Sequence, residues 1–108
     1  MTAEGRAILV TAAAEVDLGD IRTYTEETWG EAQWLSYYHE MLRTFERIAA
    51  YPLTGRSRAR FAAKLRSVPF REHVIFYLPL DGGGVAILRI LHGARNAEAL
   101  RWDGETGA

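Results

Sequence analysis

The residues best suited to chemistry in this sequence are basic and titratable side chains in its apolar C-terminal half. Lys64 and Arg66 alternate with apolar or small residues in one short segment, and Arg89 and His92 lie in the last long apolar segment or just after it. Arginine and lysine stabilise charge that develops on a phosphate, while an imidazole or a phenol hydroxyl moves protons. These four positions, with Tyr77 nearby, therefore carry the residue types that RNA cleavage requires.

A structural interpretation of the same residues is also open. Arg66 and Arg89 would pair with carboxylates on neighbouring strands, and His92 would cap the end of a strand. The side-chain period of a strand is two, so Lys64 and Arg66 share one face, whereas Arg89 and His92 point to opposite faces. A site on a single face requires the chain to bend after Leu91.

Other catalytic classes find no support in the sequence. The three histidines are scattered without carboxylates at metal-ligand spacing, and the chain has no cysteine. No serine lies in a nucleophile elbow. The glycines at 82–84 join two segments that predict strands, whereas phosphate-binding glycine loops open a helix. We therefore expect no metal site and no cofactor, and a protein that acts by binding more than by a reaction of its own.

Charge is distributed unevenly along the chain although the net charge is −1. Residues 1–42 carry two basic and eight acidic residues, whereas residues 43–71 carry eight basic residues and one acidic residue. A basic block in a nearly neutral protein predicts an acidic partner, either nucleic acid or protein. The alternative is a solvated surface of mixed charge.

The spacing of apolar residues in the first half predicts a strand and two helices. A buried strand at 7–10 leads to Thr11, which predicts a helix N-cap, and this first helix ends at Gly30. A second helix over 31–50 ends before Pro52 because the residue before a proline avoids helical geometry. The short connection makes the helices an antiparallel hairpin. The core stripe of the second helix is predicted at these positions: Ala32, Leu35, Tyr38, Leu42, Phe45 and Ile48.

The second half of the chain predicts strands. Residues 53–61 are expected to form a solvated loop, and the alternation over 64–68 predicts a half-exposed strand that Pro69 closes. The apolar segments at 73–78 and 85–91 flank the glycine turn and predict an antiparallel hairpin. The fold class is therefore α+β, in the order β-α-α-β-β-β, with the helical hairpin on one face of a small, mostly antiparallel sheet.

The length and composition predict one domain over residues 1–108, with a core at about 7–96 and a tail at 97–108 in which Trp102 folds back onto the body. No apolar segment is long enough to span a membrane, and the N-terminus lacks the features of a secretory signal. A cytoplasmic protein is expected.

Several short motifs, in order along the chain, together resemble a known family. They are Ala-x-x-Asp-Leu-x-x-Ile before Tyr24, Trp29-Gly30, Tyr51-Pro52-x-x-Gly55-Arg56, Leu65-Arg66-Ser67, His73-Val74-Ile75-Phe76-Tyr77 and Arg89-Ile90-Leu91-His92-Gly93. Over about residues 7–96 the chain resembles the ParE branch of the ParE/RelE toxin superfamily.

This resemblance implies the toxin of a type II toxin–antitoxin system, with roles in growth arrest and plasmid stabilisation. Its partner would be a ParD-like antitoxin, a DNA-binding dimer whose C-terminal segment wraps the toxin, so that operator DNA is contacted only through the antitoxin. ParE-type toxins inhibit DNA gyrase by binding, whereas RelE-type relatives cleave mRNA on the ribosome. The latter use basic residues with a tyrosine or histidine near the C-terminus. This chain has Arg95 but no tyrosine after Tyr77, which favours the gyrase-directed branch, and a non-toxic regulatory member is a third interpretation.

The antitoxin is expected to bind across the helical hairpin and the basic block. Trp34 and Tyr37 lie off the predicted core stripe, so they are predicted to be exposed aromatic anchors for an amphipathic helix. Alternatively, Trp34 packs on Phe61 or Trp102. Acidic residues of the antitoxin would meet four basic side chains: Arg58, Arg60, Lys64 and Arg66.

Overall fold

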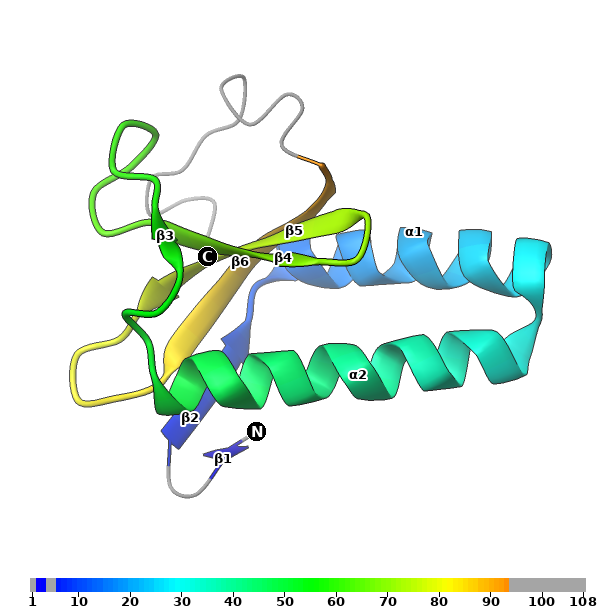
Figure 1. The fold of residues 1–108 in the computed structure, drawn as a ribbon, viewed down its shortest axis with the longest axis horizontal. Coiled ribbons are helices and arrows are strands. Elements are labelled where there is room, and N and C mark those ends of the chain that lie inside the picture. The colour runs from blue at the N-terminus through cyan, green and yellow to red at the C-terminus, as the bar shows by residue number, and fades with distance from the viewer. Residues whose placement is uncertain (1, 4–5, 94–108) are drawn as a thin grey trace.

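A helical hairpin packs on a mixed sheet in the computed structural model, which describes residues 2–3 and 6–93 (Figure 1). The elements are β1 (Thr2–Ala3), β2 (Arg6–Val10), α1 (Ala12–Trp29), α2 (Glu31–Ala50), β3 (Arg56–Ser57), β4 (Arg66–Phe70), β5 (His73–Pro79) and β6 (Val85–His92). The predicted α+β class and the predicted order of the main elements are confirmed. Arg95 and Trp102, which entered the predictions, lie outside the described residues.

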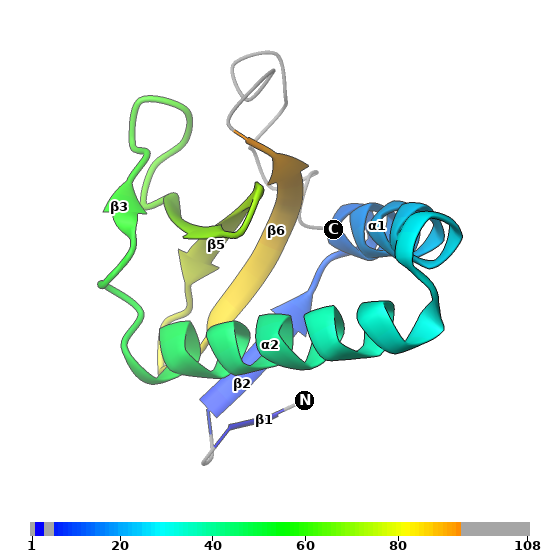
Figure 2. The same cartoon turned by 45° about the vertical axis from the view of Figure 1, so that its right-hand side comes forward.

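The described strands form a sheet in the order β1-β2-β6-β5-β4-β3. β2 pairs with β6 in parallel, and the other neighbouring strands are antiparallel. The first long strand of the chain therefore lies beside the last one. Figure 2 shows that α1 starts where β2 ends and lies beside β6.

The helix termini follow the signals in the sequence. The Thr11 side chain accepts a hydrogen bond from the backbone N–H of Ala14 at 3.1 Å, as an N-cap does. The same hydroxyl donates to the carbonyl of Leu88 at 3.0 Å, which fastens the start of α1 to β6. Gly30 connects the helices at a φ of 96°, a conformation that glycine adopts without steric cost. Neither α1 nor α2 is apolar enough over its length to span a lipid bilayer.

The core stripe of α2 differs from the prediction in its N-terminal half. Trp34 and Tyr37 are 5% and 8% exposed, whereas Leu35 is 46% exposed. The two stripes coincide at Phe45 and Ile48, but before Phe45 the observed one is offset by one position along the helix, with Met41 buried where Leu42 was predicted. Burying the larger aromatic rings removes more apolar area from water, and this burial decides the rotation of the helix. The prediction that Trp34 and Tyr37 are exposed anchors is therefore wrong.

The aromatic pairs within this core also differ from the expected ones. Trp34 stacks on Tyr38, with ring centroids 5.2 Å apart, and does not depend on Phe61. The Phe61 ring instead packs with a second, smaller apolar cluster of Leu65, Phe76 and Leu88. The predicted loop over 53–61 is thus partly structured, because it supplies both this packing and the short strand β3.

β4 begins and ends two residues later than predicted. Lys64 has a φ of 66° and lies in a turn closed by the hydrogen bond from Leu65 N to the carbonyl of Ala62, at 3.1 Å, so it does not share a strand face with Arg66. Pro69 lies within β4 instead of ending it. Among the described strands β3 pairs only with the first two residues of β4, so the missing N–H of Pro69 costs no ladder bond on that side.

Candidate functional site

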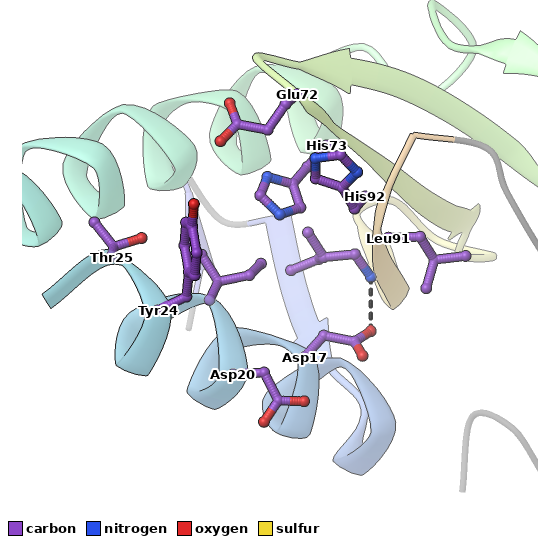
Figure 3. A pocket seen from close by; sticks show the side chains of 10 residues that line it. Asp17, Asp20, Tyr24, Thr25, Glu72, His73, Leu91 and His92 are labelled. Carbon is purple, nitrogen blue, oxygen red and sulfur yellow. Dashed lines mark hydrogen bonds between the residues drawn. The ribbon is translucent and has the colours of Figure 1, made fainter. Parts of the chain in front are cut away.

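A groove lies between α1 and the adjoining ends of β5 and β6 (Figure 3). Its main cavity has a volume of about 530 Å³ and is lined by Asp20 and Tyr24 of α1, by Glu72 before β5, and by His73 and His92. A smaller hollow of about 160 Å³ shares Tyr24 and Glu72 with it, so the two adjoin, and we call them together the groove, which extends toward the α1–α2 connection. A volume of this size fits a large side chain or a short peptide segment.

One wall of the groove is built by an ion pair at the edge of the sheet. β2 pairs with β6 only as far as Ile87, which leaves the rest of β6 without a neighbouring strand on that side. Asp17 of α1 takes that place. Its carboxylate accepts hydrogen bonds from Arg89 Nε at 2.8 Å and Nη2 at 2.9 Å, and from the backbone N–H of Ile90 at 2.8 Å.

This contact gives Arg89 a structural function. The hydrogen bonds to Asp17 raise the pKa of Arg89, so the guanidinium is held charged and is already paired. The structural interpretation placed its carboxylate partner on a neighbouring strand, whereas the partner comes from a helix. The signal for this was present in the sequence, because Asp17 interrupts an otherwise apolar or small-residue face of α1 between Ala14 and Ile21.

The base of the groove holds a cluster of titratable rings. The Tyr37 hydroxyl lies 2.6 Å from Nδ1 of His73, and the rings of His73 and His92 meet edge to face with centroids 5.5 Å apart. Burial raises the pKa of Tyr37 far above its ordinary value, so the hydroxyl stays protonated. Burial also lowers the pKa of His73, and nearby His92 acts in the same direction, whereas Glu72 opposes both. His73 is therefore neutral at physiological pH.

The stability of the protein should depend on pH through His73. Because its pKa is below the ordinary value of 6.5 in the folded protein, the unfolded chain binds the proton more readily, and stability falls as the pH drops below that value. Urea unfolding at about pH 7.5 and about pH 5.5 should show a smaller loss for His73→Gln than for the unaltered chain. The control variant His39→Gln, on the exposed surface of α2, should retain the full loss. Equal losses in all three proteins would assign the effect to other groups.

A second cluster of hydrogen bonds lies at the opposite end of α2. Arg66 Nη1 donates to the carbonyls of Leu53 at 3.2 Å and Gly55 at 2.8 Å. The buried Tyr77 hydroxyl donates to the carbonyl of Pro52 at 2.7 Å and accepts from the N–H of Gly55 at 2.9 Å. A Cβ on Gly55 would lie 2.8 Å from Cε1 of Tyr77, so only glycine fits here without displacement. Arg66 and Tyr77 thus hold the turn after α2 in place.

The four residues proposed for RNA cleavage do not converge. Arg66 of β4 pairs with Tyr77 of β5, whereas His92 of β6 pairs with His73 of β5. These two β5 positions are four residues apart, which is about 13 Å along a strand. Lys64 lies in the turn before β4, and Arg89 is bound to Asp17. Among the described residues, no group of three His, Asp or Glu side chains is placed to hold a metal ion.

Three arginines of the basic segment over 56–66 lie close to one another: Arg56, Arg58 and Arg60. Arg58 donates from Nε to Ser67 Oγ at 2.8 Å, and its guanidinium lies 5.8 Å from the centre of the Phe76 ring. Burial lowers the pKa of Arg58, and the neighbouring Arg56 and Arg60 contribute in the same direction. The guanidinium of Arg60 lies over the Phe61 ring at 4.7 Å. This clustering of like charge leaves the segment suited to an acidic partner.

Sequence reasoning missed the groove itself. Its exposed aromatic walls are Tyr24 and Trp29, which are 63% and 68% exposed and had been noticed only as motif positions. No local pattern identifies it, because α1 meets the β5–β6 ends across some fifty residues of chain.

Comparison with known protein sequences identifies the family of this chain. The sequence model of the family described as "ParE toxin of type II toxin-antitoxin system, parDE" matches residues 8–97. The chain is 40% identical to Toxin ParE1 of Caulobacter vibrioides over 86 residues, which cover 80% of this chain and 88% of that protein. It is 33% identical to Toxin ParE of Escherichia coli over 86 residues, covering 80% and 84% respectively. The chain therefore belongs to the ParE toxin family of type II toxin–antitoxin systems.

Proposed function

We propose that this toxin acts in the cytoplasm, arrests growth by binding DNA gyrase, and is neutralised by a ParD-like antitoxin. The observation that carries the proposal is the separation of the candidate catalytic side chains within a ParE-family fold. Arg66, Tyr77 and Arg89 all make hydrogen bonds that hold the fold together. An inhibitor that binds its target needs no reacting group, which agrees with this arrangement.

The antitoxin contact is proposed on two surfaces. Because Trp34 and Tyr37 are buried, they support the hairpin from within, and the exposed rings of Tyr24 and Trp29 take their place as apolar contacts along the groove. Acidic residues of the antitoxin would meet the basic segment. The residues proposed for that contact are Arg58, Arg60, Lys64 and Arg66. Attraction between these charges accelerates association more than it lowers the dissociation rate.

The function is tested with purified proteins. The toxin should inhibit DNA supercoiling by gyrase and cause cleaved DNA to accumulate, and prior mixing with the antitoxin encoded beside it should abolish both effects. Primer extension on translated mRNA provides the control for ribosome-dependent cleavage and should show no cuts within codons. Unimpaired supercoiling at a large excess of toxin would contradict the gyrase proposal, and cuts within codons would support the ribonuclease alternative.

A further inference from the structure

The turn at residues 51–55 is held more firmly than its position on the surface requires. The carbonyl of Tyr51 accepts from both the backbone N–H and the hydroxyl of Thr54, at 3.1 Å and 3.0 Å. Tyr77 and Arg66 bind the carbonyls of the following residues, as described above. Pro52 restricts the backbone further. Surface turns are usually among the more mobile parts of a protein, so this amount of fixation is unusual for a connection between a helix and an edge strand.

Two large apolar side chains project from this fixed turn into solvent. Tyr51 is 66% exposed and Leu53 is 69% exposed. The backbone of both residues is bound, whereas their side chains contribute little to the core. Within the described part of the molecule, the fixed backbone therefore does not serve to pack these two side chains into the core.

A fixed backbone with exposed apolar side chains suits recognition by a partner. Association costs free energy for each group that must be ordered, and a turn that is already ordered avoids that cost. Aromatic and aliphatic anchors that fill a pocket of the partner supply most of the affinity of such contacts. We propose that residues 51–55 form a docking knob that inserts Tyr51 and Leu53 into an apolar pocket of the protein that the toxin disables.

The surroundings of the knob define the chemistry of that pocket. Arg47 and Arg56 are exposed on either side of the turn in sequence, and Arg66 binds it directly. A complementary pocket therefore has an apolar floor and an acidic rim. A convex knob requires a preformed concavity, which a folded target supplies and an extended antitoxin segment does not.

The knob is also distant from the groove. It follows the C-terminal end of α2 (Figures 1 and 2), whereas the groove extends toward the α1–α2 connection at the other end of that helix. A helix of 20 residues is about 30 Å long, so an antitoxin segment in the groove leaves Tyr51 and Leu53 uncovered. The basic residues proposed for the antitoxin adjoin the knob through Arg66, but replacing Tyr51 and Leu53 leaves all four of those side chains in place. The inference that the knob binds a target protein rests on the proposed function as a toxin, but it does not require that the target be gyrase.

The test compares two double variants. Tyr51→Ser with Leu53→Ser removes the knob, and Val16→Ser with Leu35→Ser removes exposed apolar side chains from the helices as a matched control. Both proteins should melt within a few degrees of the unaltered toxin, because the four side chains are exposed. The knob variant should require about 30-fold more protein to inhibit gyrase and should no longer arrest growth, whereas the control should act like the unaltered toxin.

Two further measurements separate this inference from neighbouring ones. Affinity for the cognate antitoxin should change less than about threefold in the knob variant, and Arg56→Glu should weaken target inhibition more at low salt than at high salt. If the knob variant melts normally and still inhibits its target or arrests growth, the inference is wrong while the gyrase proposal stands. If it loses antitoxin binding to the same degree, the turn belongs to the antitoxin interface and the inference is again wrong. If the unaltered toxin arrests growth without affecting gyrase, the gyrase proposal fails. The knob inference is then tested by growth alone: it holds if the knob variant no longer arrests growth and is wrong if it does.

Discussion

Replacing Asp17 with alanine should lower the free energy of unfolding by about 3 kcal/mol. The substitution leaves Arg89, whose side chain is 21% exposed, without its anion, and it leaves the N–H of Ile90 without an acceptor. An unpaired charge and an unsatisfied donor at the edge of a core are each costly, so the two losses act together. Urea unfolding followed by circular dichroism measures the effect.

Two comparison variants test whether the loss of stability comes from the buried position and the charge of Asp17. Glu26→Ala breaks the exposed pair with Arg22, whose atoms are 3.0 Å apart, and should change stability by less than about 0.5 kcal/mol. Asp17→Asn retains an acceptor for Ile90 but loses the charge, so its stability should lie between those of the other two. If Asp17→Ala were as mild as Glu26→Ala, water would be replacing the carboxylate and α1 would not be closing the edge of β6.

Replacing Tyr77 with phenylalanine should lower the free energy of unfolding by about 2 kcal/mol. The ring is fully buried and its packing is retained, but the carbonyl of Pro52 and the N–H of Gly55 both lose their partner. Amide hydrogen exchange should therefore accelerate at residues 54 and 55 before it accelerates elsewhere. Tyr24→Phe, at an exposed ring, should be nearly neutral. Unchanged exchange at the turn would show that Arg66 alone is enough to fix it.

Local signals in the sequence predicted the helices well. Thr11, Gly30 and Pro52 end or begin helices by rules that involve only near neighbours, and these boundaries were correct. The rotation of α2 was not predictable in the same way, since two overlapping apolar stripes fit its sequence. The sheet that covers the helix decides between them, and the hydroxyl of Tyr37 becomes acceptable there only because His73 is in reach.

The candidate site was less accessible to sequence reasoning. Arg89 was selected correctly as an unusual residue, but its partner Asp17 lies 72 positions away. Gly55 is part of a sequence motif, but the requirement for glycine there comes from the close approach of Tyr77, which depends on how the strands pair. Contacts between residues distant in the chain produced both the groove and the fixed turn. Patterns with a period of two or 3.6 residues carry no information about such contacts.

The pairing of β2 with β6 has a consequence for synthesis of the protein. Residues 8–10 find their partners at 85–87, and the cap of α1 reaches Leu88. Domains can begin to fold while the ribosome is still adding residues, but contacts between distant parts of the chain wait for the later part to emerge. An incomplete chain that ends before β6 thus has neither the partner strand of its own N-terminus nor the acceptor for the Thr11 hydroxyl. β2 therefore joins the sheet only after residues 85–87 have been synthesised, and the helical hairpin that follows β2 is attached to β6 no earlier than that.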